Sequence, residues 1–221
     1  MRVKELVDAI RKRTKTSINE TEAKALLKEY GVPVVQEVVA KDGQEAVNAA
    51  DIFGYPVVVK GLGAELAHKT ERGLVHLNLN APRAVEKAVE AIRASAGDDL
   101  EGFLIQPQIQ GKRELVAGLF RDHQFGPVVM FGIGGVFTEA LADVTFRLAP
   151  LTEVDATDML TEIRAQALLG SYRGEKAIHR EHIIQTLQGL SRIGVELPEI
   201  AEIDINPLLA TSDGHLCAVD A

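Results

Sequence analysis

Oxygen-bearing side chains gather near the C-terminal end of the chain in the pattern of a β-hairpin. The strand-like segment Glu202-Ile-Asp-Ile-Asn-Pro207 is followed by an Asp213-Gly214 turn and then by Asp220. A hairpin that turns at Asp213 places Asn206 opposite Asp220, and opposed residues have Cβ atoms ~4.5–5.5 Å apart on one sheet face. Asp204 shares that face because side chains alternate along a strand, and Pro207 is a position where the strand can bulge.

This arrangement of oxygens fits a hard cation. Mg²⁺ binds one or two protein oxygens together with substrate phosphates, so Asn206, Asp220 and Asp204 are candidate ligands. The alternative is a plain hairpin in which Asn206-Pro207 begins a turn and Asp220 is solvated.

Two other segments have the composition of an anion site. Lys60 ends the apolar segment Pro56-Val-Val-Val, where a lysine can reach phosphate as a point charge. A strand-end lysine in water is the alternative. Gly132-Ile-Gly-Gly135 gives backbone N–H groups close access to an anion, although a tight turn has the same composition. The spacing matches neither a Walker loop nor a dinucleotide fingerprint.

Five further side chains have chemistry of their own. His68 has the chemistry of a nucleophile or proton shuttle, and a surface histidine is the alternative. Glu114 can accept hydrogen bonds from a ribose or be an edge-strand charge. His179 and His182 have metal-ligand spacing but no evident third ligand, so we interpret them as the exposed start of a helix. Cys217 is interpreted as a buried strand residue.

Composition excludes several classes of protein. The chain has 221 residues, which predicts one domain or two tightly joined lobes, and 46% are hydrophobic, which argues against disorder. We find no apolar run of ~18 residues and no signal-like start, so no membrane segment is expected. The net charge of −8 disfavours non-specific nucleic-acid binding. A single cysteine excludes an internal disulfide and is typical of a reducing compartment, so a cytoplasmic location is expected.

Hydrophobic periodicity predicts an α+β protein of two lobes. The first part alternates helices and strands, with helices expected over residues 2–13, from Asn19, over 44–53 and from Pro82, and strands over 34–40, 56–60 and 74–79. From Gly102 onward strands dominate, and the strands over 103–109 and 114–120 are expected to pair. Further strands are expected over 127–131, 136–141, 144–148, 200–205 and 215–219. Helices are expected over 153–169 and 180–193.

Several segments, in their order along the chain, carry a resemblance to a known family. They are Glu22-Ala-Lys-Ala-Leu-Leu27 with Tyr30-Gly-Val-Pro33, Pro56-Val-Val-Val-Lys60, His68-Lys-Thr70, residues 125–135, residues 138–143, Phe146-Arg-Leu-Ala-Pro150, Arg173-Gly174 and residues 202–207. From about Thr21 to Ala221, the chain resembles the ATP-grasp subunit, or fused ATP-grasp portion, of nucleoside-diphosphate-forming acyl-CoA synthetases. This family includes the ADP-forming acetyl-CoA synthetases and is related to succinyl-CoA synthetase.

The resemblance implies a two-lobed ATP-grasp fold that clamps ATP or ADP between its lobes. The expected divisions are an N-terminal helix over 1–19, one lobe over 20–100 and a second lobe over 101–221. By match to the family, Lys60 contacts the phosphates and Glu114 binds the ribose. Gly134 and Gly135 line the part of the nucleotide site that holds the phosphates. The backbone of Gln106, Pro107, Gln108 and Ile109 forms the hinge beside adenine. Asn206 and Asp220 match magnesium ligands, Asp204 fits the same acidic pattern, and His68 matches a phosphoryl-carrying histidine.

The implied reaction is acyl-CoA + ADP + phosphate ⇌ acid + CoA + ATP. A chain of 221 residues has room for the two lobes that bind the nucleotide but not for a CoA-binding domain. The resemblance therefore implies a partner, either in a hetero-oligomer or in a fused chain. That partner is a CoA-binding alpha subunit or domain that carries the first phosphohistidine. Two alternatives stay open: a regulatory ATP-grasp module of a fused protein acetyltransferase, and a stand-alone carboxylate–amine ligase, which needs no histidine at position 68.

Overall fold

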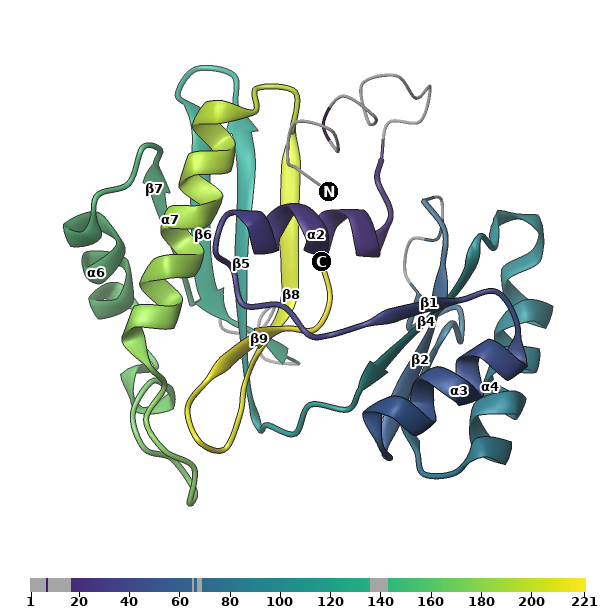
Figure 1. Ribbon diagram of the computed structural model, residues 1–221. Coiled ribbons are helices and arrows are strands. Elements are labelled where there is room, and N and C mark those ends of the chain that lie inside the picture. Colours follow the sequence, from purple (N-terminus) through teal and green to yellow (C-terminus); the bar gives the residue numbers. More distant parts are fainter. Residues whose placement is uncertain (1–6, 8–16, 65, 67–68, 136–142) are drawn as a thin grey trace. The chain divides into compact units, whose positions relative to one another are not determined.

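The computed structural model describes Val7, residues 17–64, Leu66, residues 69–135 and residues 143–221. It divides into two compact units, one made of Met1–Ala23 and Val35–Gln108 and the other of Lys24–Val34 and Ile109–Ala221. Each unit contains one antiparallel sheet with helices packed on it (Figure 1). The expectation of an α+β protein is therefore confirmed. In the described part of the chain, no helix is long and apolar enough to cross a membrane.

The first unit has a four-stranded sheet in the order β1-β4-β2-β3. Its strands are β1 (Val38–Ala40), β2 (Val57–Leu62), β3 (Val75–Leu79) and β4 (Gly102–Pro107), and its helices are α3 (Gly43–Phe53), α4 (Pro82–Ala96) and the short η1 (Gly97–Asp99). Asp42 caps α3, because its side chain accepts a hydrogen bond from the backbone N–H of Glu45. Pro82 starts α4, where its fixed φ suits the first turn.

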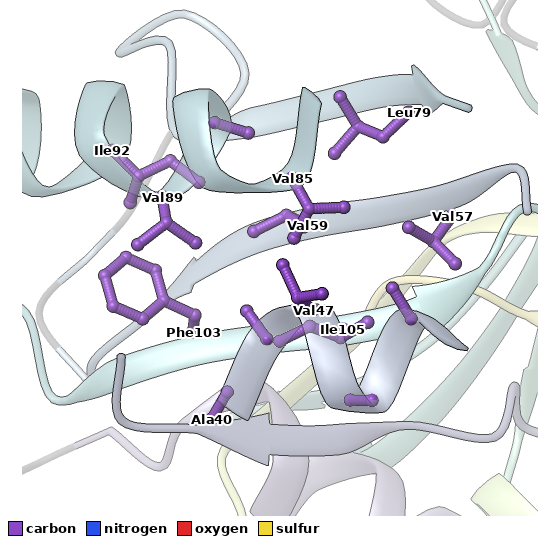
Figure 2. Close-up of a cluster of buried hydrophobic side chains, with 14 of the residues drawn as sticks. Ala40, Val47, Val57, Val59, Leu79, Val85, Val89, Ile92, Phe103 and Ile105 are labelled. Carbon is purple, nitrogen blue, oxygen red and sulfur yellow. The ribbon is translucent and has the colours of Figure 1, made fainter. Parts of the chain in front are cut away.

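The hydrophobic core of this unit explains where Lys60 points. Val57 and Val59 of β2 and Phe103 and Ile105 of β4 pack against the apolar faces of α3 and α4 (Figure 2). Because side chains alternate along a strand, Lys60 lies on the opposite face of the sheet.

One expected strand pairing is wrong. Residues 103–109 were expected to pair with 114–120, whereas β4 pairs with β1 on one side and β2 on the other. The register aligns Val39 with Leu104 and Val58 with Gln106, so β4 is a central strand whose apolar residues complete the first core. The first compact unit consequently includes β4 and extends to Gln108.

The second unit has a five-stranded sheet in the order β7-β6-β5-β8-β9. The strands are β5 (Arg113–Asp122), β6 (Gly126–Ile133), β7 (Val144–Leu148), β8 (Glu202–Ala210) and β9 (Leu216–Ala218). Its helices are α6 (Glu153–Glu162), η3 (Gln166–Leu168) and α7 (Arg180–Glu196), and α2 (Glu20–Glu29) gives its first residues to the first unit and the rest to the second. The single helix expected over 153–169 is wrong, because α6 ends at Glu162 and the side chain of Asp143 accepts the backbone N–H groups of Arg164 and Ala165.

Helices cover one face of this second sheet. Helix α7 packs on β5 and β6, and α6 packs on β7. A Cβ added at Gly194 of α7 would lie 2.9 Å from Leu119 of β5, so Leu119 is on the covered face. The alternate residues of β5, among them Glu114, Gly118 and Phe120, are therefore on the other face, which we call the open face.

The hairpin formed by β8 and β9 turns at residues 211–214, as the sequence predicts. The N–H of Gly214 donates to the carbonyl oxygen of Thr211, and the N–H of His179 donates to Gly214. Gly214 has a φ of 94°, and an added Cβ would lie 2.2 Å from the carbonyl oxygen of Ala177. Only glycine fits this turn against the segment that precedes α7.

We expect Gly214→Ala to destabilise the protein by about 4 kcal/mol, because it adds a backbone clash to left-handed strain. Gly126 is a matched control: its φ is 81°, but nothing lies within 4 Å of an added Cβ. Gly126→Ala should cost only about 1 kcal/mol. Chemical denaturation of both variants measures the difference, and equal losses would contradict this account of the turn.

Candidate functional site

Lys60 lies in a cluster of charged groups within the first unit. It is 3% exposed in an otherwise apolar strand. Its Nζ donates a hydrogen bond of 2.7 Å to Oε1 of Glu20, and Nζ of Lys69 donates one of 2.6 Å to Oε2 of the same carboxylate. The strand-end lysine in water is thus excluded. The sequence analysis missed Glu20, because an acidic residue at the start of a helix is common on electrostatic grounds alone.

The segment predicted to form the hinge beside adenine contains the boundary between the two units. Gln106 is buried in β4, opposite Val58. The N–H of Gln108 donates to the carbonyl oxygen of Pro56, and its side chain bonds both the backbone N–H and the side-chain oxygen of Asn78. That N–H and that side chain thus stabilise the first unit.

The open face of the second sheet carries the predicted acidic residues. Asp204 pairs with Gly118 and Glu202 pairs with Phe120, so all four are on the open face. Asp204 and Asn206 are exposed, whereas Ile205 between them is buried. Gly118 has no side chain, and a Cβ added there would lie 3.2 Å from the side chain of Met130. Phe120 and Phe146 form an edge-to-face pair, with ring centroids 6.1 Å apart.

The hairpin has the predicted register over its paired residues. Leu208 pairs with Ala218 and Ala210 with Leu216. Asn206 and Asp220 lie beyond these pairs, so their facing each other stays a prediction. The pairing of β5 with β8 is irregular between Leu115 and Ala117, which accommodates an extra residue of β8 beside Asn206-Pro207. The possible bulge at Pro207 is therefore present.

Electrostatics link Asp204 to the residues around it. Desolvation raises the pKa of Asp204 above its ordinary value, and the negative charges of Glu202 and Asp220 raise it further. Part of Asp204 remains accessible to solvent, so the effect is moderated by water. A raised pKa means that the ionised carboxylate is disfavoured where it stands, and a bound cation would relieve that cost.

We expect Asp204→Asn to stabilise the protein in the absence of divalent cations, by on the order of 1–2 °C in melting temperature near pH 7. The folded state holds the Asp204 proton to higher pH than the unfolded state does, so wild-type stability falls as pH rises through this raised pKa. Thermal unfolding with a chelator across acidic to neutral pH measures this. Identical pH dependence in the wild type and the variant would contradict the interpretation.

Glu114 and the glycines after β6 lie next to each other. The N–H of Gly134 donates a 2.7 Å hydrogen bond to the carbonyl oxygen of Glu114. A Cβ at Gly135, whose φ is 74°, would lie 3.0 Å from Oε2 of Glu114. The structure therefore brings the predicted ribose ligand and the predicted phosphate-side glycines together on the second unit.

The donor set on the open face fits Mg²⁺ in one particular way. Among the residues that the structure describes, no group of three or more His, Cys, Asp or Glu side chains could hold a metal by itself. Asn206, Asp220 and Asp204 supply amide and carboxylate oxygens of the kind Mg²⁺ takes, and Mg²⁺ completes its shell with water and phosphate. The residues present therefore fit a magnesium ion that arrives with a nucleotide.

His68 lies outside the residues that the structure describes, as do residues 138–142 of the family-like segment 138–143 and the strand expected over 136–141. Asp143, at the end of that segment, is buried. Burial acts to raise its pKa, but the hydrogen bonds from the N–H groups of Arg164 and Ala165, together with the Arg164 side chain, hold it below its ordinary range. Asp143 therefore stabilises the turn after α6.

Arg113 organises the loop that contains the family-like pair Arg173-Gly174. Its buried guanidinium donates a hydrogen bond of 3.0 Å to the carboxylate of Glu175, and it also donates to the carbonyl oxygens of Leu168, Gly170 and Lys176. The sequence did not reveal this role of Arg113, because its hydrogen-bond partners lie more than fifty residues away in the chain.

Three histidines form a cluster at the start of α7. The ring centroids of His179, His182 and His215 lie 4.7–5.3 Å apart. His215 is the neighbour that sequence spacing did not reveal, and desolvation followed by the charges of the other two rings lowers the pKa of His182. A pocket of about 690 Å³ borders the cluster and includes none of the predicted nucleotide or metal residues.

Cys217 is partly buried, and desolvation raises the pKa of its thiol to about 11, which fits an unreactive strand residue.

Comparison with known proteins identifies the family. A model of the ATP-grasp domain matches residues 9–221. The beta subunit of acetate–CoA ligase [ADP-forming] I from Pyrococcus furiosus is 42% identical over 207 residues, covering 91% of this chain and 89% of that subunit. Acetate–CoA ligase [ADP-forming] I from Archaeoglobus fulgidus is 37% identical over 195 residues, which are 86% of this chain but 28% of that longer protein.

A solved structure agrees with these relatives. It is the dinucleotide-forming acetyl-coenzyme A synthetase 1 of Ca. Korarchaeum cryptofilum in complex with coenzyme A and Mg-AMPPCP, with its phosphohistidine segment pointing towards the nucleotide binding site. The TM-score is 0.85 at 39% sequence identity, over 99% of this chain and 97% of that one. The chain therefore belongs to the ATP-grasp family, as the counterpart of the beta subunit, or of the matching part of the fused chain, of ADP-forming acyl-CoA synthetases.

Proposed function

We propose that this chain exchanges a phosphoryl group between a phosphohistidine and ADP as the nucleotide-binding part of an ADP-forming acyl-CoA synthetase. The overall reaction is acyl-CoA + ADP + phosphate ⇌ acid + CoA + ATP. The observation that carries the proposal is on the second sheet, where Asp204 lies on the open face, Asn206 follows it on the same strand, and Asp220 follows strand β9, which pairs with β8.

The residues divide the work of holding the nucleotide. Asn206 and Asp220, with Asp204, would hold Mg²⁺, which when bound neutralises charge on the phosphate oxygens. Lys60 would contact phosphates, Glu114 the ribose, and the backbone of Gly134 and Gly135 the phosphate side. The backbone around Gln106, Pro107, Gln108 and Ile109 would lie beside adenine. Phosphoryl transfer depends mainly on positioning and charge stabilisation, which is what such residues supply.

His68 is the proposed carrier of the phosphoryl group. Starting from ATP, a neutral imidazole nitrogen of His68 attacks the γ-phosphorus, and the bond from that phosphorus to the bridging oxygen breaks so that ADP leaves. The imidazole loses its other N–H proton to solvent as the phosphoramidate forms. The reverse step gives the group to the β-phosphate oxygen of ADP, which yields ATP and the free imidazole. An unperturbed histidine titrates near ~6.5, so the neutral form is available at pH 7. The alternative is that His68 only hydrogen-bonds a phosphate.

The reaction needs a partner. This chain spans nearly the whole of one relative that is a separate beta subunit and about a quarter of a fused one. We therefore propose that a CoA-binding alpha subunit or fused domain forms the acyl phosphate and carries the first phosphohistidine, and that the assembly works in the cytoplasm.

Co-purification with a candidate CoA-binding partner, followed by an assay of acyl-CoA-dependent ATP formation, tests the proposal. We expect ATP from the combined proteins and none from this chain alone. Full turnover by the chain alone, or association with a protein acetyltransferase and no synthesis of ATP, would contradict it.

A further inference from the structure

One carboxylate in the first unit accepts hydrogen bonds from two lysine ammonium groups. Oε1 of Glu20 accepts a hydrogen bond from Lys60 and Oε2 accepts one from Lys69, at 2.7 and 2.6 Å. The side chains of Glu20, Lys60 and Lys69 are 1%, 4% and 15% exposed. The three groups together are net positive and are largely withdrawn from water.

The three residues come from three separate pieces of backbone. Glu20 is the first residue of α2, whose start is fixed by reciprocal hydrogen bonds between Asn19 and Glu22. Lys60 belongs to β2. Lys69 is fixed through its carbonyl oxygen, which accepts the N–H of Leu74 at 2.8 Å. The carboxylate therefore joins a helix, a strand and a turn at one point.

Electrostatics decide what the carboxylate does there. Two ammonium groups that approach one position repel each other, and burial disfavours the charged form of each. A carboxylate between them offsets both effects, and removing one member of a buried ion pair leaves a buried charge uncompensated. Glu20 thus holds the two ammonium groups beside one carboxylate.

Such a pair of cations suits a phosphate ligand. A lysine acts on phosphate as a point charge on a flexible stem, so its effect depends on where the ammonium is held. A fixed carboxylate between two lysines removes that flexibility before the ligand arrives, which reduces the entropy lost on binding.

We propose that Glu20 is a positioning residue for nucleotide phosphates, which holds Lys60 and Lys69 as a fixed pair of cations. The inference deepens the proposed function and rests on it, because there Lys60 contacts phosphate. Glu20 itself touches the lysines and not the nucleotide.

The test measures the affinity for ADP in the presence of Mg²⁺ by calorimetry, on the full protein, from about pH 7 to about pH 9.5. Glu20→Gln keeps the size of the side chain and removes its charge. We expect affinity about tenfold weaker at pH 7 and a further loss at alkaline pH that begins at lower pH than in the wild type, because a lysine without its carboxylate loses its proton more readily. Glu29→Gln is the control: the same change on the same helix, at an exposed carboxylate in its last turn. It should leave affinity and pH dependence unchanged.

A double variant separates charge from simple packing. Glu20→Gln combined with Lys69→Met removes the repulsion that Glu20→Gln creates, so the alkaline loss should return toward its wild-type position. A purely structural role of Glu20 predicts no such return. If Glu20→Gln fails to fold while the double variant folds, uncompensated repulsion is the cause and the inference is supported. If neither folds, Glu20 is a folding residue and the inference is lost.

The variant Lys60→Met tests separately whether Lys60 contacts the nucleotide phosphates, which is the part of the proposed function on which this inference rests. Unchanged ADP affinity in Lys60→Met would remove the phosphate role of Lys60, and the positioning role with it. Weakened affinity in Lys60→Met together with wild-type behaviour of Glu20→Gln would overturn the positioning role alone.

Discussion

Replacement of His68 by alanine is expected to abolish acyl-CoA-dependent ATP formation in the complete enzyme. Alanine has no nitrogen to accept the phosphoryl group, and a nucleotide site and a remote acyl site cannot both hold one phosphate. Loss of a covalent carrier typically removes turnover by several orders of magnitude, as is seen when a nucleophile is deleted. ADP affinity should change little, because the carrier is needed for transfer and not for binding.

The matched control for this variant is His123→Ala, which removes an exposed histidine in the turn between β5 and β6. It should retain wild-type turnover. Both variants are assayed with the CoA-binding partner, and phosphate on this chain is followed by its acid lability. If His68→Ala keeps full turnover but loses the label, the phosphoryl group passes directly between nucleotide and partner, and the carrier role is lost.

Asp220→Ala is expected to weaken magnesium-dependent ADP binding by about ten- to a hundredfold, because it removes one of the few protein oxygens offered to the metal. The fold should survive, since a substitution away from the core usually costs within ~0.5 kcal/mol. Calorimetric titration with ADP, with and without Mg²⁺, measures both effects.

Asp158→Ala is the control for this second variant, because it removes an equal charge from the exposed surface of α6. It should bind Mg²⁺ and ADP as the wild type does. Equal magnesium-dependent affinity in the wild type and Asp220→Ala would refute the assignment of Asp220 as a ligand.

Local sequence signals predicted the parts of the fold that local physics controls. The hairpin of β8 and β9 follows from an Asp213-Gly214 turn between alternating strands, and its register holds in the structure. Helices α4 and α7 follow from their apolar stripes and from Pro82 and His179 at their starts. In each of these cases the deciding residues lie within one element or one turn.

Contacts between distant segments decided what the sequence did not reveal. The place of β4 between β1 and β2 depends on a core shared with α3 and α4, and a strand carries no local mark of its partners. Glu20 meets Lys60 and Lys69, and His215 meets His179 and His182, only because the fold brings them together. A single sequence shows such residues but not their proximity.

Phosphorylation by ATP tests the central claim most directly, since it does not depend on the identity of the acyl group. The complete protein, with its CoA-binding partner, is incubated with γ-labelled ATP and Mg²⁺, and this chain is analysed for label. We predict an acid-labile label at His68 that added ADP discharges as labelled ATP. A protein that binds Mg²⁺ and ATP but carries no such label, or carries one that ADP cannot discharge, would contradict the account.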